Sequence, residues 1–189
     1  MKNKINAFFE NIKIYLENNK KQIIINYIIF GVLLFVLLLI DLLTKQFIFE
    51  WSSDGKIGNG RIQFECPFIG IKSISNDGLT VFLNILPIPV IHFLNFIILF
   101  VCLGFLVFLK SPSFVVAITF ICAGTLGNMI DRFLFNSVRD IIYLPWINRG
   151  DNVSVFNLAD LDAGIGAIIA VVSLIVYIIK DAIKSRKNR

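Results

Sequence analysis

Long apolar runs alternate with shorter polar segments along the chain. Four runs, at residues 23–43, 85–109, 114–130 and 163–179, are candidates for helices that cross a membrane. A bilayer-spanning helix needs about 20 mostly apolar residues. The first two runs reach this length, and the last two are shorter and carry polar residues at one end. The pattern predicts an all-α membrane protein with four transmembrane helices.

The connection between the first two predicted spans, residues 46–83, is too long for a simple turn. Apolar residues alternate with others in "RIQFECPF", which is the pattern of a half-buried strand, and "IKSIS" can supply its partner. We therefore expect a small extracytoplasmic β element with short strands in this loop.

Residues 1–22 precede the first span and show a different periodicity. Apolar side chains recur there at helical spacing among five lysines: Ile5, Phe8, Phe9, Ile12, Tyr15 and Leu16. This pattern predicts an amphipathic helix on the inner membrane surface. The alternative is a frayed basic tail that only fixes the orientation of the chain.

Composition and charge agree with a membrane protein. Hydrophobic residues make up 57% of the chain and charged residues 16%, which is too little charge for the surface of a soluble domain. A net charge of +5 would suggest nucleic acid in a soluble protein. Here, however, eleven of the eighteen Lys and Arg fall in residues 1–22, 110–113 and 180–189. By the positive-inside rule these segments are cytoplasmic, and we expect no nucleic-acid partner.

The expected organisation is therefore a cytoplasmic amphipathic helix at 1–22, one four-helix membrane domain at 23–179 and a basic cytoplasmic tail at 180–189. In this orientation Asp41, Asp131 and Asp160 all lie at the outer leaflet. Asp140 follows Asp131 closely enough to reach the same place. Ionisable residues at membrane depth are costly, so this gathering indicates a functional site.

Helical spacing sharpens the picture. Gly124, Gly127, Asn128 and Asp131 share one face of the third span. Asn157, Asp160 and Gly164 share a face at the start of the fourth. Asp41 and Lys45 form an i, i+4 pair of opposite charge, which we interpret as structural rather than catalytic.

The chain lacks the sequence signatures of serine hydrolases, zinc peptidases and nucleotide-binding loops. Cys66, Cys102 and Cys122 have neither metal-ligand nor redox spacing, so we expect no metal, no cofactor and no disulfide. Two neighbouring carboxylates that share a proton could run an aspartic protease. The same residues could relay protons in a transporter, although the inner halves of three predicted spans are almost entirely apolar. Residue chemistry alone leaves these two classes open.

Four motifs in this chain resemble those of lipoprotein signal peptidase, also called signal peptidase II. They are "DLLTK" (residues 41–45), "GTLGNMIDR" (124–132), "VRD" (138–140) and "FNLAD" (156–160), in the family's order. The resemblance covers about residues 23–179. It implies a four-span membrane aspartic endopeptidase of the bacterial plasma membrane that is inhibited by globomycin, a cyclic peptide.

The resemblance also implies a substrate and a site. Such enzymes remove the signal peptide from diacylglyceryl-modified prolipoproteins, cutting before the lipidated cysteine at the outer membrane surface. We expect a monomer whose partners are these prolipoproteins and membrane lipids. Carried over by motif, the roles are catalytic for Asp140 and Asp160, substrate-binding for Asn128, Arg132 and Asn157, and supporting for Asp41, Lys45, Gly124, Gly127, Asp131, Asn76 and Gly78. The intact aspartate pair argues against a non-catalytic relative.

The chain departs from the family pattern in places. The usual Asn-x-Gly-Ala-Ala-Phe stretch is matched only at Asn76 and Gly78. Ile141 follows the Val-Arg-Asp motif, where the family commonly has Phe. Leu161 stands where Ser or Thr usually follows the last catalytic aspartate. Asp162 adds a charge near Asp140 and Asp160, the expected catalytic dyad.

Overall fold

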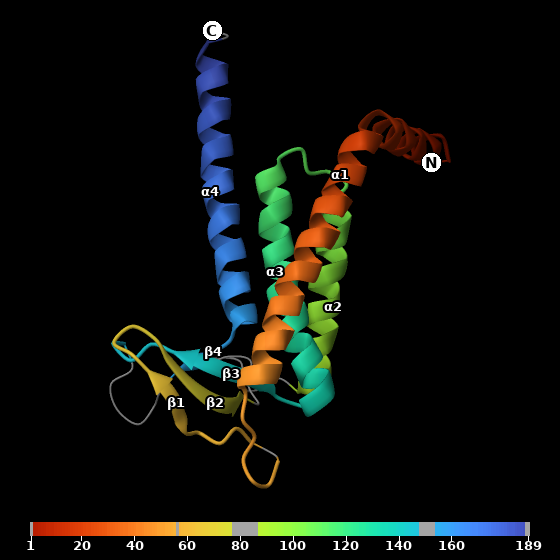
Figure 1. The fold of residues 1–189 in the computed structure, drawn as a ribbon. Helices are drawn as coiled ribbons and strands as arrows, with labels where there is room; N and C mark the ends of the chain where they lie inside the picture. Colours follow the sequence, from red (N-terminus) through yellow and green to blue (C-terminus); the bar gives the residue numbers. More distant parts are fainter. Residues whose placement is uncertain (1, 56, 77–86, 148–153, 188–189) are drawn as a thin grey trace.

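The computed structural model describes residues 2–55, 57–76, 87–147 and 154–187, with only the backbone of residues 2–5. Four helices are present in the described part of the chain: α1 (Lys2–Ile48), α2 (Ile88–Phe105), α3 (Pro112–Phe135) and α4 (Leu158–Lys187). All four are long and apolar enough to cross a membrane. They run side by side, with a small sheet at one end (Figure 1). This arrangement confirms the predicted all-α membrane architecture with a small β element.

The helices near the sheet extend beyond the apolar runs that predicted them, because polar residues are part of them. α3 continues five residues past Ile130 and ends at Phe135. The next residue, Asn136, caps the helix with a φ of 56°, the left-handed conformation common at helix C-termini. α4 begins at Leu158, before the predicted start at residue 163. These extra turns contain Asp131, Arg132 and Asp160, at the end of the bundle that meets the sheet.

α3 occupies the centre of the bundle and packs most extensively against α4. Two glycines of α3 permit this close approach. A Cβ added at Gly124 would lie 2.3 Å from the Ala159 carbonyl oxygen, and one at Gly127 would lie 2.5 Å from Asp41 Oδ2. Small residues let transmembrane helices approach at backbone distance. Here they bring the start of α4 and the C-terminal end of α1 against the same face of α3.

The sheet has four antiparallel strands in the order β1 (Ile62–Glu65), β2 (Gly70–Asn76), β3 (Val138–Tyr143) and β4 (Val155–Phe156). The first two strands are the hairpin predicted from the loop pattern. β3 and β4 were not predicted from the sequence. β3 follows α3 and β4 precedes α4, so the sheet is attached directly to the two helices that pack most extensively against each other (Figure 1).

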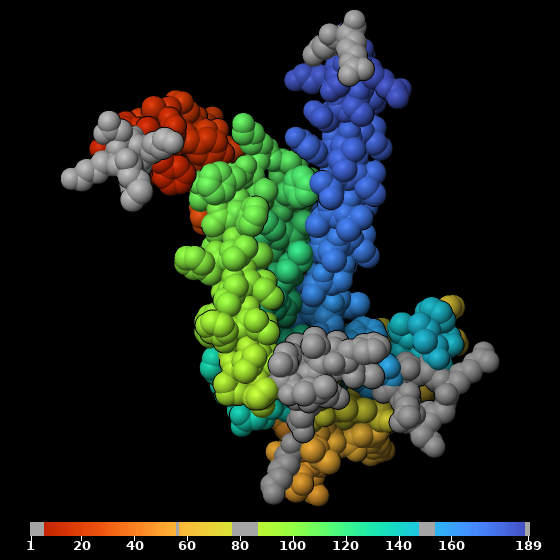
Figure 2. All heavy atoms as spheres, turned by 180° about the vertical axis from the view of Figure 1, so that it is seen from behind, coloured from red at the N-terminus to blue at the C-terminus, as the bar shows by residue number. Residues whose placement is uncertain are grey.

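At the opposite end of the bundle, the α1 residue Asn26 is fully buried. Its side-chain amide donates to the carbonyl oxygens of Leu106 and Leu109, both at 2.8 Å. These carbonyls belong to the turn after α2 and lack helical partners, so Asn26 supplies the hydrogen bonds that this turn needs. Beyond this level, the first turns of α1 and the last turns of α4 project away from the bundle (Figure 2).

Candidate active site

The expected catalytic residues come from two elements that meet at the sheet end of the bundle. Asp140 lies in the middle of β3 and is 2% exposed, whereas Asp160 lies in the first turn of α4 and is exposed. Their different settings follow from these elements. β3 is an inner strand of the sheet with β2 on one side and β4 on the other, and a helix start faces solvent.

Asn157 is the residue before α4 and exchanges two hydrogen bonds with Asp160. The Asp160 backbone N–H donates to Asn157 Oδ1 at 3.0 Å, and the Asn157 backbone N–H donates to Asp160 Oδ2 at 3.1 Å. This reciprocal pattern is a capping box. It fixes the Asp160 carboxylate at the positive end of the helix dipole, where an anion is stabilised.

Two asparagine amides connect the carboxylates of the expected dyad. Asn157 Nδ2 donates to Asp140 Oδ1 at 2.7 Å and also to Asn128 Oδ1 at 3.0 Å. Asn128 Nδ2 in turn donates to Asp160 Oδ1 at 2.7 Å. Asn157 therefore contacts both aspartates, through its backbone and side-chain atoms, and places them at one site.

Burial raises the pKa of Asp140 to about 7, and the negative charge of Asp160 pushes it in the same direction. Hydrogen bonds from Asn76 and Asn157 oppose this effect because they stabilise the ionised form. The Asn76 bond, from Nδ2 to Asp140 Oδ2, is 2.9 Å long and crosses from β2 to β3. Asp140 can therefore keep a proton close to neutral pH.

A second group of charges lies behind the dyad, centred on the fully buried Lys45. Its ammonium lies 2.9 Å from Asp41 Oδ2, 3.2 Å from Asp131 Oδ2 and 3.3 Å from Asn128 Oδ1. The predicted pair of Asp41 and Lys45 is thus present. Because Asn128 Oδ1 faces Lys45 and Asn157, its NH2 group is directed to Asp160.

The carboxylates of this second group also connect the elements. Asp41 Oδ1 accepts a hydrogen bond from the Ala159 backbone N–H at 3.0 Å and so connects α1 to the start of α4. Asp131 accepts two bonds from the Arg139 guanidinium, at 2.8 and 3.1 Å, and one from its backbone N–H at 3.0 Å. These three bonds fix the start of β3 and thereby the position of Asp140.

The role of Arg139 was not predicted from the sequence. The available signal was that a buried Asp131 needs cations and that Val-Arg-Asp follows it closely. The contact of Asn76 with Asp140 was also unforeseen, although Asn76 had been assigned a supporting role. Gly78 lies outside the described residues.

Arg132 is 5% exposed and lies within the electrostatic influence of both Asp140 and Asp160. One of its guanidinium N–H groups, on Nη1, donates to the Asn128 carbonyl oxygen at 3.4 Å. Asp162, which was expected near the dyad, interacts instead with the charges of Asp41 and Lys45. Asp41 and Asp131 therefore contact Lys45 directly, and Asp162 lies within the electrostatic influence of Asp41 and Lys45.

Comparisons with known proteins agree on one family. A sequence model of signal peptidase (SPase) II matches residues 33–176. The lipoprotein signal peptidase of Mycoplasma genitalium is 28% identical over 191 residues, covering 100% of both chains. That of Mycoplasma pneumoniae is 33% identical over 123 residues, which are 63% of this chain and 65% of the relative.

A solved structure supports the same assignment. A bacterial membrane enzyme determined at 1.9 Å resolution superposes with a TM-score of 0.63 and 29% identity, covering 77% of this chain and 91% of that one. The family match spans well over half of the sequence and includes all four helices at least in part. This multi-pass membrane protein therefore belongs to the signal peptidase II family, whose members are proteases.

Proposed function

We propose that the protein is a membrane aspartic endopeptidase that removes the signal peptide from diacylglyceryl-modified prolipoproteins. It cuts the peptide bond before the lipidated cysteine. The observation that carries the proposal is the joint contact of Asn157 with Asp140 and Asp160, which brings an exposed and a buried carboxylate to one site. The family match and the names of the relatives supply the substrate class.

The two aspartates take different roles because their environments differ. Asp140, whose pKa is raised to about 7, holds a proton and donates a hydrogen bond to the substrate carbonyl. Asp160 accepts hydrogen bonds from the Asn128 side chain and the Asn157 backbone N–H, and it takes a proton from the attacking water.

Proton transfers within the reaction return both carboxyl groups of the dyad to their starting protonation states. Water oxygen bonds to the carbonyl carbon, its proton passes to Asp160, and the Asp140 proton moves to the carbonyl oxygen. When the tetrahedral intermediate collapses, the C–N bond breaks and the proton held on Asp160 goes to the amine of the cysteine. The hydroxyl that received the Asp140 proton returns it to that carboxylate, which restores the dyad.

Arg132 and Asn128 lie beside the dyad, and the family resemblance implies that both bind the substrate backbone. Asn128 already uses its amide on Asp160, Asn157 and Lys45. The backbone carbonyl oxygen of Asn128 accepts a hydrogen bond from Arg132. Its main contribution is therefore to orient Asp160, while the Arg132 guanidinium is the group proposed to meet substrate carbonyls.

We propose, from the positions of Lys and Arg along the chain, that the site faces the extracytoplasmic side of the bacterial plasma membrane and that both termini are cytoplasmic. The dyad lies at the sheet end of the bundle, and the basic segments lie at the other (Figure 1). A prolipoprotein could thus keep its lipid chains in the outer leaflet while the peptide enters the site.

A cleavage assay tests the proposal. The purified protein should cut a diacylglyceryl-modified lipobox peptide, should be blocked by globomycin, and should leave the unlipidated peptide intact. Asp140→Asn and Asp160→Asn should each abolish cleavage, while Asp181→Asn, a matched change at the far end of α4, should leave it unchanged. Retained cleavage in either dyad variant would remove that residue from the mechanism.

A further inference from the structure

α1 is much longer than a membrane span requires. It runs without interruption for 47 residues, which at the usual helical rise is about 70 Å. The hydrocarbon core of a bilayer is only about 30 Å thick. Asp41 and Lys45 hold the outer end of α1 in the site. The surplus length therefore lies at the other end of the bundle, where Figure 1 shows the first turns leaving the bundle direction.

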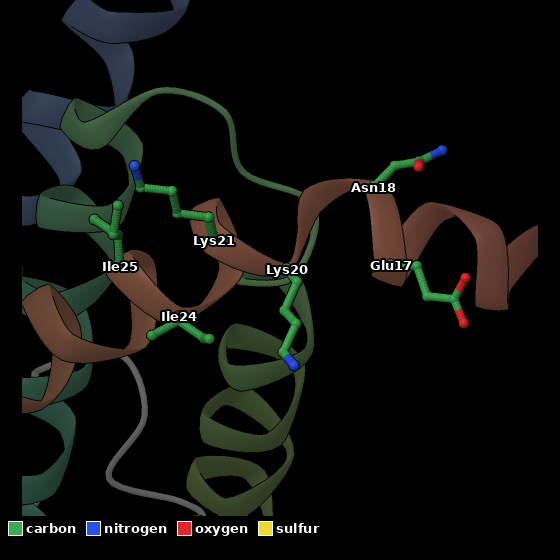
Figure 3. Close-up of a pocket in the computed structure, with 6 residues that line it drawn as sticks. All are labelled: Glu17, Asn18, Lys20, Lys21, Ile24 and Ile25. Atoms are coloured by element: carbon green, nitrogen blue, oxygen red, sulfur yellow. The ribbon is translucent and has the colours of Figure 1, made fainter.

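The bend in α1 has a local cause. Residues 2–30 contain neither proline nor glycine. Instead, Asn19 Nδ2 donates to the Tyr15 carbonyl oxygen at 2.8 Å, and a side chain that bonds to the i−4 carbonyl competes with the helical ladder. Figure 3 shows the change of direction between Asn18 and Lys20. Asn26, less than two turns later, marks the end of α2.

Tyr15 sets the rotation of the helix before the bend. Its hydroxyl donates to the Val107 carbonyl oxygen at 3.5 Å, and its ring lies 5.7 Å from that of Phe108. The face that bears Tyr15 is therefore directed toward the bundle. Phe8 and Ile12 lie on the same face by helical spacing, and they are 61% and 38% exposed. No described side chain buries them, and the bilayer lies in that direction.

Charge is distributed around this apolar face. Residues 1–22 hold five lysines and two glutamates. Glu10 and Glu17 project from the side opposite Phe8 and Ile12, whereas Lys13 and Lys20 flank the apolar face. All four charged side chains are exposed. Lysines at the edge of an apolar stripe can reach lipid phosphates while their stems stay in the apolar region.

A hollow of about 460 Å³ follows the bend and is lined by residues of α1 alone: Glu17, Asn18, Lys20, Lys21, Ile24 and Ile25. Lys20 and Lys21 leave opposite sides of the helix (Figure 3). They do not converge on one anion. The charges of this segment are therefore suited to several headgroups in a plane rather than to one bound ligand.

We propose that residues 6–22 of α1 lie in the cytoplasmic interface of the membrane and dock on anionic phospholipids. Phe8, Ile12 and Leu16 enter the acyl region, and Lys13, Lys20 and Lys21 meet lipid phosphates. Continuity with the membrane span, the rotation fixed by Tyr15 and the excess of positive charge all favour a lipid surface over a protein partner.

A matched pair of tryptophan variants tests the depth of this helix. Phe8→Trp and Ile14→Trp are made separately in a Trp51→Phe/Trp146→Phe background, since Ile14 points away from the face that bears Phe8 and Ile12. The full-length proteins are placed in vesicles whose acyl chains carry bromine. Fluorescence of the Phe8→Trp protein should be quenched strongly and that of the Ile14→Trp protein weakly. Equal quenching, or strong quenching of the Ile14→Trp protein alone, would overturn the proposal.

The lipid charge is tested in the Phe8→Trp protein. Quenching should be stronger in vesicles with phosphatidylglycerol than in phosphatidylcholine alone. Lys13→Gln/Lys20→Gln/Lys21→Gln should weaken docking on the anionic vesicles by roughly fivefold per lysine. Lys180→Gln/Lys184→Gln/Lys187→Gln removes the same charge from α4 and should not.

Two outcomes would refute lipid docking. One is an equal effect of both triple variants. The other is a blue-shifted emission of the Phe8→Trp protein that bromolipids do not quench, which would indicate a protein partner, such as a second copy of the chain.

Discussion

Asp41 and Asp131 differ from Asp140 and Asp160 in the groups that their carboxylates contact, although all four lie at the sheet end of the bundle. The first two face the buried cations of Lys45 and Arg139. The other two face the neutral amides of Asn76, Asn128 and Asn157. The comparison separates the charges that hold the elements together from those available for chemistry.

The largest expected effect is a loss of turnover when Asp140 or Asp160, the aspartates held by amides, is changed. Asp160→Asn removes the proton acceptor but keeps the shape of the side chain and an oxygen for the Asn157 backbone N–H. We expect turnover to fall by roughly 10²- to 10⁴-fold, as for the loss of a general base, with little change in thermal unfolding. Rates of peptide cleavage and unfolding temperatures in detergent measure both quantities. A large loss of stability with normal turnover per folded molecule would reverse the comparison.

The next largest effect is a loss of stability when Asp41 or Asp131, the aspartates that face cations, is changed. Asp131→Asn leaves Lys45 and Arg139 buried with one carboxylate fewer, and breaking such a pair costs about 3–5 kcal/mol. We expect a lower unfolding temperature and a lower yield of folded protein. Asp181→Asn, an exposed site, should change stability by less than about 0.5 kcal/mol. Equal stability of the two variants would show that the Asp131 ion pairs do not hold the bundle together.

Asn157 both caps α4 and contacts Asp140, and two substitutions distinguish these roles. Asn157→Ser keeps a good N-cap but removes the amide that donates to Asp140. We expect nearly unchanged stability and a loss of activity of roughly tenfold or more, because the side chain no longer positions Asp140 and Asn128. Asn157→Ala should lose about 1 kcal/mol of stability in addition. If Ser and Ala behave alike in both assays, the cap and the dyad are not separable in this way.

The smallest effect is a displacement of the pH profile. Turnover requires protonated Asp140, whose pKa is raised to about 7, so the rate should fall as pH rises through about 7. The hydrogen bond from Asn76 lowers this pKa, because it stabilises the ionised form. Asn76→Ala should therefore move the falling limb to higher pH. A limb that stays in place, or moves to lower pH, would show that this amide does not tune Asp140.

The membrane part of the fold could be predicted because length and hydropathy alone specify a span. The end of α3 and the start of α4 were predicted too short, since the last turn of α3 and the first turn of α4 are held by caps and buried polar contacts rather than by apolar side chains. β3 was missed for a related reason. Arg139 and Asp140 are both buried in consecutive positions, so the strand shows none of the alternation that marks a half-buried strand.

The site was only partly predictable. Because successive spans cross the membrane in alternating directions, the sequence predicted that the aspartates share one leaflet. Helical spacing identified the pair of Asp41 and Lys45. Spacing could not choose Asp140 over Asp131, because the choice depends on partners distant in the sequence. Asn76 contacts Asp140 from β2, and Lys45 contacts Asp131 from α1. The resemblance to a family made that choice.

The most direct test of the division between the two kinds of aspartate compares turnover per folded molecule. Asp140→Asn and Asp131→Asn are purified in parallel, the folded fraction of each is measured, and cleavage of a diacylglyceryl-modified lipobox peptide is followed. We predict that folded Asp131→Asn retains turnover within about tenfold of the unmodified protein, whereas folded Asp140→Asn loses roughly 10²-fold or more. Cleavage by Asp140→Asn at the rate of the unmodified protein would contradict the account.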